Sequence, residues 1–231
     1  MYQINFDSPV HVHFIGIGGI SMSGLAEVLL QEGFTISGSD SQQSELTRHL
    51  EEKGATVFYG QTADNIKPGI DVVVYTAAIH PDNAEFAAAR SAGIPMLTRA
   101  ELLGEIMRNY KTAIAVAGTH GKTTTTSMIS MILLEAQADP TISVGGILPE
   151  IGGNIRVGRS DLFLTEACEY TNSFLSFFPK IGIILNMDAD HLDFFKDIDD
   201  IRHSFREFAR LLPTDGMLII NADTPKYDYV T

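Results

Sequence analysis

The sequence has 231 residues, of which 45% are hydrophobic and 19% are charged, and its mean hydropathy is +0.09. This composition supports a buried core and excludes an intrinsically disordered chain. Acidic residues outnumber basic ones 29 to 16, for a formal net charge of −13, which argues against a basic nucleic-acid-binding face. The single cysteine, Cys168, excludes an intrachain disulfide and a cysteine-based zinc site, and it indicates a reducing, cytoplasmic location.

The apolar stretches of the sequence are short. None approaches the roughly 20 residues that a membrane-spanning helix requires. The N-terminus carries no basic region ahead of its first apolar run, so we expect neither a signal peptide nor a membrane partner.

Short apolar runs alternate with longer amphipathic runs along the first part of the chain, a pattern typical of α/β proteins with a largely parallel sheet. The pattern predicts strands at residues 12–17, 35–38, 56–59, 72–75 and 96–98, and helices at residues 22–31, 45–53 and 83–92.

The alternation starts again after a short helix expected at residues 102–109. Further strands are predicted at residues 112–117, 162–165, 181–185 and 217–220, and helices at residues 124–136 and 198–212. The 124–136 helix places Met128, Ile129, Ile132 and Leu133 on one face. We therefore expect a Rossmann-like domain at residues 1–105 and a P-loop-type α/β domain at residues 106–231. Because such a domain normally continues after a strand like 217–220, we expect the second domain to be incomplete.

The first glycine-rich loop, Gly16-Ile17-Gly18-Gly19-Ile20-Ser21, lies between a predicted strand and a predicted helix. Glycines let a backbone turn tightly against a pyrophosphate, whose charge the helix amides then meet. Asp40 lies at the end of the next strand, where a dinucleotide site contacts a sugar hydroxyl. Ser21 replaces the third glycine of the usual pattern, and a tight turn without a ligand is the alternative.

The second loop, Gly118-Thr119-His120-Gly121-Lys122-Thr123-Thr124, follows the strand predicted at residues 112–117. Its amides suit a triphosphate, with Lys122 reaching the β- and γ-phosphates and the Thr123 hydroxyl on Mg²⁺. The strict phosphate-loop pattern requires glycine where this chain has Val116, so the loop is a shortened variant. We interpret it as an ATP site.

Two strand ends carry groups that suit a metal ion. Glu166 directly follows the strand predicted at residues 162–165, where a carboxylate reaches Mg²⁺ beside a phosphate loop. Glu169 comes next as a supporting or solvated carboxylate. His191 lies in an acidic loop after the strand at residues 181–185. It either binds Mg²⁺ or Mn²⁺, caps the following helix, or orients Asp190 and Asp193. The remaining histidines are interpreted as surface or packing residues: His11, His13, His49, His80 and His203.

These motifs together resemble the Mur ligases of peptidoglycan synthesis. The resemblance rests on GIGGISMSGLA at residues 16–26, SGSD ending at Asp40, GTHGKTTT at residues 118–125, EACEYTNSFL at residues 166–175 and NMDADHLD at residues 186–193. It covers essentially the whole chain and looks closest to the alanine-adding branch. The branch that attaches a whole tripeptide to the same sugar nucleotide ranks second.

The resemblance implies a three-domain enzyme of which the C-terminal, amino-acid-binding domain is absent here. ATP would phosphorylate the lactyl carboxylate of UDP-N-acetylmuramate, and L-alanine would attack the acyl phosphate. The implied sugar-nucleotide residues are Gly16, Ile17, Gly18, Gly19, Ile20, Ser21, Asp40, Thr76, Ala77 and Ala78. The implied catalytic residues are Lys122, Glu166 and His191, with metal held by Thr123, Glu166 and His191. Several family members carry a carbamate-modified lysine in the region that reads Ser204-Phe205-Arg206 here, so no such ligand is expected.

Two other functions remain open at this point. An oxidoreductase would use the first loop for NAD(P), but it leaves Lys122, Glu166 and His191 unexplained. A non-catalytic module that binds a UDP-sugar would suit an incomplete second domain.

Overall fold

The computed structural model describes residues 2–231. Contacts within the chain divide it into two compact units, Met1–Ile106 and Met107–Thr231. Across the described residues, no helix combines the length and the apolar character that crossing a membrane requires.

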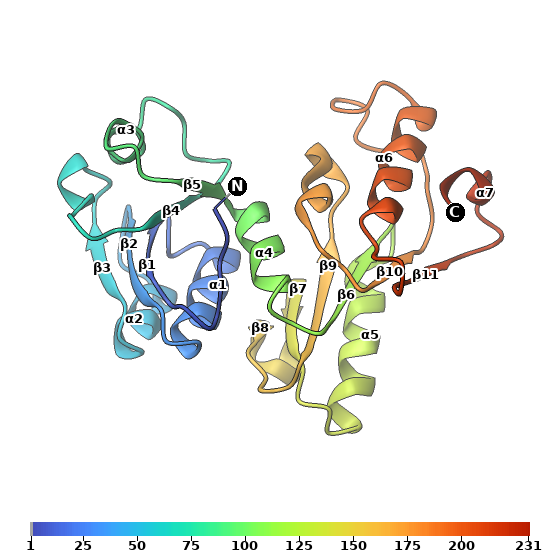
Figure 1. The fold of residues 1–231 in the computed structure, drawn as a ribbon, viewed down its shortest axis with the longest axis horizontal. Coiled ribbons are helices and arrows are strands. Elements are labelled where there is room, and N and C mark those ends of the chain that lie inside the picture. Colours follow the sequence, from blue (N-terminus) through green and yellow to red (C-terminus); the bar gives the residue numbers. More distant parts are fainter. Residues whose placement is uncertain (1) are drawn as a thin grey trace. The chain divides into compact units, whose positions relative to one another are not determined.

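The first unit is a five-stranded parallel sheet in the order β3-β2-β1-β4-β5 (Figure 1). Its elements are β1 (His11–Ile15), α1 (Ile20–Gln31), β2 (Thr35–Asp40), α2 (Glu45–Glu52), β3 (Thr56–Tyr59), η1 (Ala63–Asn65), β4 (Val72–Tyr75), α3 (Ala84–Ser91), β5 (Met96–Thr98) and α4 (Arg99–Met107). The strand order reverses between β1 and β4, which is where doubly wound sheets bind their ligands.

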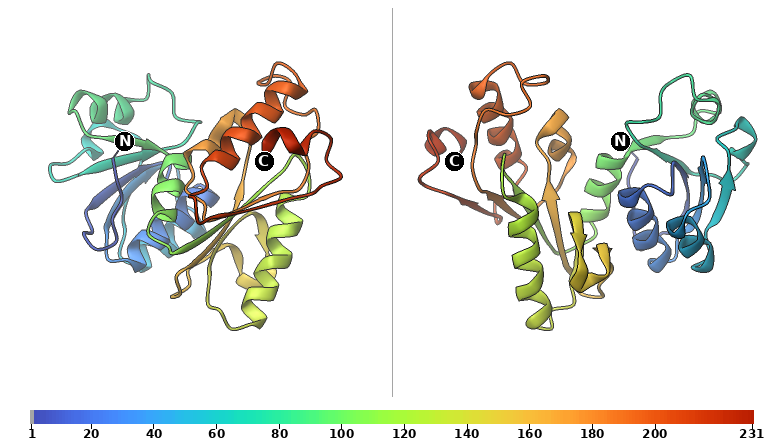
Figure 2. Two further views of the ribbon diagram at one scale, coloured as in Figure 1. Left: turned by 45° about the vertical axis from the view of Figure 1, so that its right-hand side comes forward. Right: turned by 180° about the vertical axis from the view of Figure 1, so that it is seen from behind.

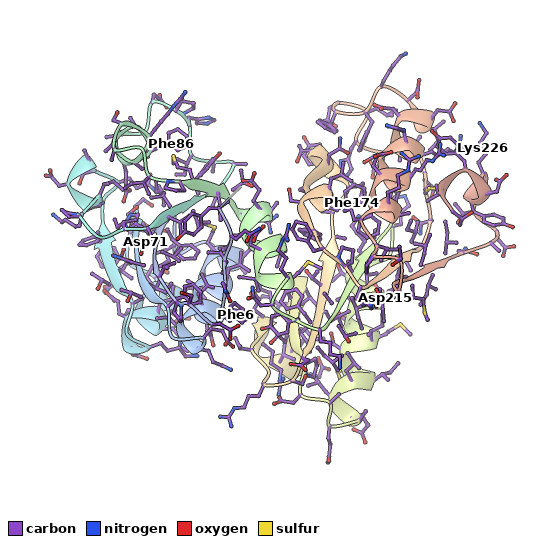
Figure 3. The ribbon with its side chains drawn as sticks, in the orientation of Figure 1. Phe6, Asp71, Phe86, Phe174, Asp215 and Lys226 are labelled. Atoms are coloured by element: carbon purple, nitrogen blue, oxygen red, sulfur yellow. The ribbon has the colours of Figure 1, made fainter. Side chains whose placement is uncertain are left out.

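The face of this sheet that α3 covers combines an apolar cluster with a buried polar network. Ile15, Ile70, Val73 and Ala89 form the cluster, and Phe86 of α3 packs against it (Figure 3). Beside the cluster, fully buried His13 bonds to fully buried Glu85 through Nε2 and Oε1 at 2.7 Å. Because each buried polar atom there has a partner, the network avoids the cost of an unsatisfied group.

The second unit contains a six-stranded sheet in the order β11-β10-β6-β9-β7-β8, parallel except for the β7–β8 hairpin. Its elements are β6 (Thr112–Ala117), α5 (Lys122–Glu135), β7 (Thr141–Leu148), η2 (Pro149–Ile151), β8 (Gly153–Arg156), β9 (Leu162–Ala167), η3 (Tyr170–Ser176), β10 (Ile181–Ile184), α6 (Ile198–Arg210), β11 (Met217–Ile220) and α7 (Tyr227–Val230).

Helices cover both faces of the second sheet, as the two views of Figure 2 show. α5 packs against β7 and β9. On the other face, a Cβ added at Gly182 of β10 would lie 3.4 Å from the ring of Phe208 in α6. Phe174 of η3 (Figure 3) stacks on Phe208 with ring centroids 4.9 Å apart.

The α/β class and the parallel strands are as predicted, but several element boundaries are wrong. α1 begins at Ile20 and α5 at Lys122, two residues earlier than predicted in each case. α4 spans Arg99–Met107 instead of residues 102–109, and the sequence analysis missed β7 and β8 altogether. On α5, Met128 and Ile132 share a face as expected, yet they are 61% and 65% exposed.

Candidate functional site

The first glycine loop is held to the end of β2 by backbone hydrogen bonds. Gly16, in the left-handed region at φ +86°, and Ile17 both donate their amides to the Ser39 carbonyl, at 2.8 and 2.9 Å. Only glycine adopts such a φ without strain. The loop therefore turns sharply at Gly16 and presents its remaining amides at the carboxyl end of β1.

Asp40 braces this loop directly. Its Oδ2 accepts the Gly18 amide at 2.8 Å, and its Oδ1 accepts the Ser41 amide at 2.8 Å. A Cβ at Gly18 would lie 2.8 Å from Asp40 Oδ2 and 2.9 Å from Thr47 Cγ2, so only glycine fits there. The sequence analysis assigned Asp40 to a sugar hydroxyl, but each of its two carboxylate oxygens already accepts a backbone amide.

The buried polar network of the first unit lies directly beneath this brace. The Ser39 hydroxyl donates to Glu85 Oε2 at 2.5 Å, and the Ser37 hydroxyl bonds to His13 Nδ1 at 2.8 Å and to His11 Nε2 at 2.7 Å. Burial is the main cause that lowers the pKa of His11, with the neighbouring His13 adding to it and the Gly69 carbonyl and Asp71 opposing it. His11 and His13 are therefore packing residues, as expected, and they support the strand that carries Ser39 and Asp40.

α1 and α5 begin differently from α2, α3 and α6. Side chains cap α2, α3 and α6, by Ser44, Asn83 and Asp197 respectively. α1 and α5 instead begin after Gly19 and Gly121, which offer no side-chain cap. The first amides of these two helices therefore lack intrahelical acceptors and suit an anion.

A cation and a hydroxyl accompany the start of α1. Arg99 Nη1 donates to Ser21 Oγ at 3.3 Å, and the Thr76 hydroxyl accepts the Ala78 amide at 3.2 Å. A Cβ at Gly16 would lie 3.8 Å from Thr76 Cγ2, which places the 76–78 segment beside the loop. The structure thus gathers the predicted sugar-nucleotide residues around the ends of β1, β2 and β4, and it adds Arg99.

The second glycine loop follows β6, between β10 and β9 in the sheet. The side chain of Asn186 clasps it, accepting the His120 amide at 2.8 Å and donating to the His120 carbonyl at 2.9 Å. The Thr119 amide bonds to the Asn186 carbonyl at 3.3 Å. Because Asn186 engages the Thr119 and His120 amides, the Gly121 amide and those that open α5 are left for phosphate.

Lys122 lies folded back over its own loop. Its Nζ donates to the Gly118 and Thr119 carbonyls at 2.6 and 3.3 Å and to Glu169 Oε2 at 2.8 Å. The side chains of Lys122 and Glu169 are 15% and 2% exposed. The ammonium thus bonds to three protein oxygens, one of them charged.

Glu166 and Thr123 form an oxygen-rich corner beside Lys122. The Thr123 hydroxyl donates to Glu166 Oε2 at 3.0 Å, and Glu166 Oε1 accepts the Gly145 amide at 2.6 Å. Mg²⁺ prefers one or two carboxylates together with phosphate oxygens and water. The pair therefore fits the predicted metal, with the rest of the coordination left to a nucleotide and solvent.

His191 lies apart from this pair, next to Glu169 and Tyr170. Its Nε2 is 3.9 Å from Glu169 Oε1, and its ring lies 4.6 Å from that of Tyr170. The Tyr170 hydroxyl donates to Asp193 at 2.8 Å, and this bond and the Asp193 charge raise the pKa of Tyr170. Among residues 2–231, no three His, Cys, Asp or Glu side chains gather closely enough to hold a metal, so metal binding by His191 stays a prediction.

Family models match both units of the chain. The Mur ligase family catalytic-domain model matches residues 11–111, and the Mur ligase middle-domain model matches residues 116–231. The chain belongs to the Mur ligase family. Both glycine-rich loops and the strand ends beside them lie within the matched residues.

The Mur ligases that are similar to this chain carry the names of two kinds of ligase. UDP-N-acetylmuramate–L-alanine ligase of Agathobacter rectalis is 69% identical over all of this chain and half of its own length. The crystal structure of UDP-N-acetylmuramate-alanine ligase from Thermotoga maritima is 31% identical, with a TM-score of 0.80 over 96% of this chain and 51% of that chain. The crystal structure of UDP-N-acetylmuramate:L-alanyl-gamma-D-glutamyl-meso-diaminopimelate ligase from Neisseria meningitides is 28% identical, with a TM-score of 0.84 over 96% of this chain and 74% of that chain. This Mur ligase chain spans about half the length of the curated relatives it matches.

The structure adds three residues that the sequence analysis did not assign to a site: Arg99, Gly145 and Asn186. It also gives Glu169, expected as a supporting or solvated carboxylate, a contact with Lys122. Arg99 directly follows β5, and a cation at a strand end is a recognisable signal. Gly145 lies in the strand that was missed. Glu169 and Asn186 stand within motifs of the resemblance, but nothing in the sequence indicates that they contact Lys122 and His120.

Proposed function

We propose that this chain is the sugar-nucleotide- and ATP-binding part of a cytoplasmic ligase that joins L-alanine to UDP-N-acetylmuramate in peptidoglycan biosynthesis. The observation that carries the proposal is the pairing of two uncapped glycine loops, at Gly19 and Gly121, within a Mur ligase chain. The 69% identity to a relative named as the alanine ligase favours L-alanine as the amino acid.

In this proposal the first loop binds the diphosphate of UDP-N-acetylmuramate. The amides that open α1, at Ile20 and Ser21, would meet the phosphate oxygens, and Arg99 would add a positive charge beside them. Thr76, Ala77 and Ala78 would line the uridine side. Asp40 would contact the ribose only through the lone pairs that Gly18 and Ser41 leave free.

The second loop would bind ATP. The amides that open α5 and the Lys122 ammonium would neutralise the phosphates, and Thr123 with Glu166 would hold Mg²⁺ against them. Bound Mg²⁺ withdraws charge from the transferring phosphoryl group. His191 would be a further metal ligand through Nδ1, with its Nε2 left facing Glu169.

The reaction in this proposal has two steps. A lactyl carboxylate oxygen attacks the γ-phosphorus of ATP, and the bond to the bridging oxygen breaks as ADP leaves. The amine of L-alanine then attacks the acyl carbon, phosphate departs and the amine loses a proton. Both reactants of the first step, ATP and the lactyl carboxylate, are anions that repel each other. The chain has a net charge of −13, so the Lys122 ammonium would be needed to neutralise part of their negative charge.

A second candidate is the ligase that attaches a tripeptide to the same sugar nucleotide. The TM-score of 0.84 to the Neisseria structure favours it. A module that only binds the UDP-sugar is a third candidate, because the first glycine loop and its Asp40 brace lie wholly within the first unit.

The test uses the purified 231-residue chain in calorimetric titrations with UDP-N-acetylmuramate, NADPH and Mg·AMPPNP. We expect it to bind the first and third ligands but not NADPH. We also expect no alanine-dependent phosphate release from ATP, because no group in residues 2–231 is assigned to hold the amine. Binding of NADPH alone would support the oxidoreductase, and binding of the UDP-sugar alone would support the non-catalytic module. Alanine- against tripeptide-dependent phosphate release by the whole reading frame separates the two ligases.

A further inference from the structure

Glu169 carries a buried oxygen that has no hydrogen-bond partner. Its carboxylate is 2% exposed, Oε2 accepts from Lys122 at 2.8 Å, and Oε1 is buried without any hydrogen bond among the described residues. A buried oxygen that lacks a bond is costly, and a charged one is costlier still. Glu169 Oε1 would therefore be stabilised by one more hydrogen-bond donor.

His191 is the donor within reach. Its Nε2 lies 3.9 Å from Glu169 Oε1, beyond hydrogen-bond distance, and its side chain is 35% exposed. A rotation of the imidazole by a small amount would bring an Nε2–H into bonding distance of this oxygen. The backbone of His191 is in the left-handed region at φ +51°, which is uncommon for a residue other than glycine.

Lys122 is held on the opposite oxygen of the same carboxylate. Its three donors go to Gly118, Thr119 and Glu169, all of them protein oxygens. To reach a phosphate, the ammonium must give up at least one of these bonds. The bond to Glu169 joins two largely buried charges and is the strongest of the three.

We propose that Glu169 is a positioning residue that exchanges partners, holding Lys122 back while the loop is empty and bonding His191 once a nucleoside triphosphate draws Lys122 away. The exchange lets the buried carboxylate keep a donor in both states. It also couples the arrival of the triphosphate to the orientation of His191, without any covalent step. This inference rests on the proposed ATP site.

The affinity of the loop for Mg·AMPPNP tests the first half of the exchange. Glu169→Gln removes the charge that competes with phosphate for Lys122, at nearly constant shape. We expect the variant to bind Mg·AMPPNP more tightly than the wild-type chain by roughly tenfold, the scale of one hydrogen bond to a charged group. Glu135→Gln is the matched control, because it removes the same charge from the exposed far end of α5, about 20 Å along the helix at 1.5 Å per residue, and should leave the affinity unchanged.

The imidazole signals of His191 test the second half, in the wild-type chain and in Glu169→Gln. In the wild type, Mg·AMPPNP should shift the His191 ¹⁵N resonances toward those of a hydrogen-bonded Nε2–H. In Glu169→Gln this shift should shrink, whereas a shift caused by metal coordination would persist. The wild-type spectrum needs no variant, so the test stands even where Glu169→Gln folds poorly.

The possible results distinguish a failure of the proposed ATP site from a failure of the partner exchange at Glu169. No binding of Mg·AMPPNP by the wild-type chain would overturn the proposed ATP site, and this inference with it. Binding by the wild type, together with unchanged or weaker binding by Glu169→Gln, would overturn the exchange alone. A His191 response that is identical in both proteins would also overturn the exchange.

Discussion

The two glycine loops use a carboxylate in opposite ways. In the first loop, Asp40 bonds to a backbone amide, that of Gly18, and so fixes the main chain. In the second loop, Glu169 and Glu166 bond to side chains that would contact phosphate or metal, those of Lys122 and Thr123. In the first loop the carboxylate fixes the backbone. In the second loop the carboxylates bond to the side chains that would contact phosphate or metal when a nucleotide binds.

This difference agrees with the chemistry proposed for each loop. A diphosphate that only has to be held suits a rigid cradle of amides, which costs no reorganisation on binding. A triphosphate that reacts needs charge that can follow the moving phosphoryl group. Changes in the first loop should therefore alter stability and binding together. Changes in the second should alter binding and turnover, with a cost in stability where a buried charge such as that of Glu169 is left unpaired.

Removal of the Lys122 charge is the change with the largest expected effect. Lys122→Ala should lower ligation by the whole enzyme by at least about 10²–10³-fold, the usual cost of losing one preorganised donor to a transition state. Steady-state phosphate release measures it, with Lys67→Ala as the control for the loss of one exposed charge. Near-normal turnover by Lys122→Ala would contradict the assignment of the loop.

Neutralisation of Glu166 separates metal binding from nucleotide binding. Glu166→Gln keeps an oxygen for the Gly145 amide but loses the charge that would attract Mg²⁺. We expect AMPPNP affinity in the presence of Mg²⁺ to fall by roughly 10–100-fold, as when a metal site loses a supporting group. With EDTA present, wild type and variant should bind AMPPNP alike. An equal loss in both conditions would mean that Glu166 serves the fold.

A methyl group at Gly18 tests the rigid cradle. Gly18→Ala would place a Cβ 2.8 Å from Asp40 Oδ2, and such overpacking costs about 1–3 kcal/mol of unfolding free energy. Gly19→Ala is the matched control, since the nearest atom to its Cβ would be 3.5 Å away. Urea denaturation should show the larger loss for Gly18→Ala, which should also bind UDP-N-acetylmuramate more weakly. Equal stability of the two variants would show that the Asp40 side chain can move aside without a measurable loss of stability.

Arg99 should have the smallest effect of the four. Arg99→Ala removes a cation beside Ser21, and we expect the affinity for UDP-N-acetylmuramate to fall by about tenfold, the scale of one charge-assisted bond. The loss should shrink as salt is raised, because Arg99 is only half-buried and salt still screens its charge. Calorimetry at two salt concentrations checks this, and unchanged affinity at low salt would remove Arg99 from the site.

The sequence predicted the fold class and the two glycine-rich loops between a strand and a helix because both depend on local signals. Apolar runs of strand length and glycines before a helix need no knowledge of distant residues. The hairpin of β7 and β8 was missed because Gly145 and Gly146 interrupt its apolar run. A glycine pair in a short run weakens the signal of a strand.

The contacts within each site could not be predicted in the same way. The bond between Lys122 and Glu169 joins residues 47 positions apart, and the bond between Gly18 and Asp40 joins residues 22 apart. Their geometry depends on strand register and on which rotamer packing allows, neither of which a motif specifies. Sequence therefore named Asp40 and Glu169 as acidic residues near a loop but left open which atoms they hold.

A crossed titration tests the central claim that one Mur ligase chain carries two separate anion sites of different design. The wild-type chain, Gly18→Ala and Lys122→Ala are each titrated with UDP-N-acetylmuramate and with Mg·AMPPNP. We predict that Gly18→Ala loses affinity for the sugar nucleotide alone and that Lys122→Ala loses affinity for Mg·AMPPNP alone. Loss of both ligands in either folded variant, or binding of both ligands through one loop, would contradict the account.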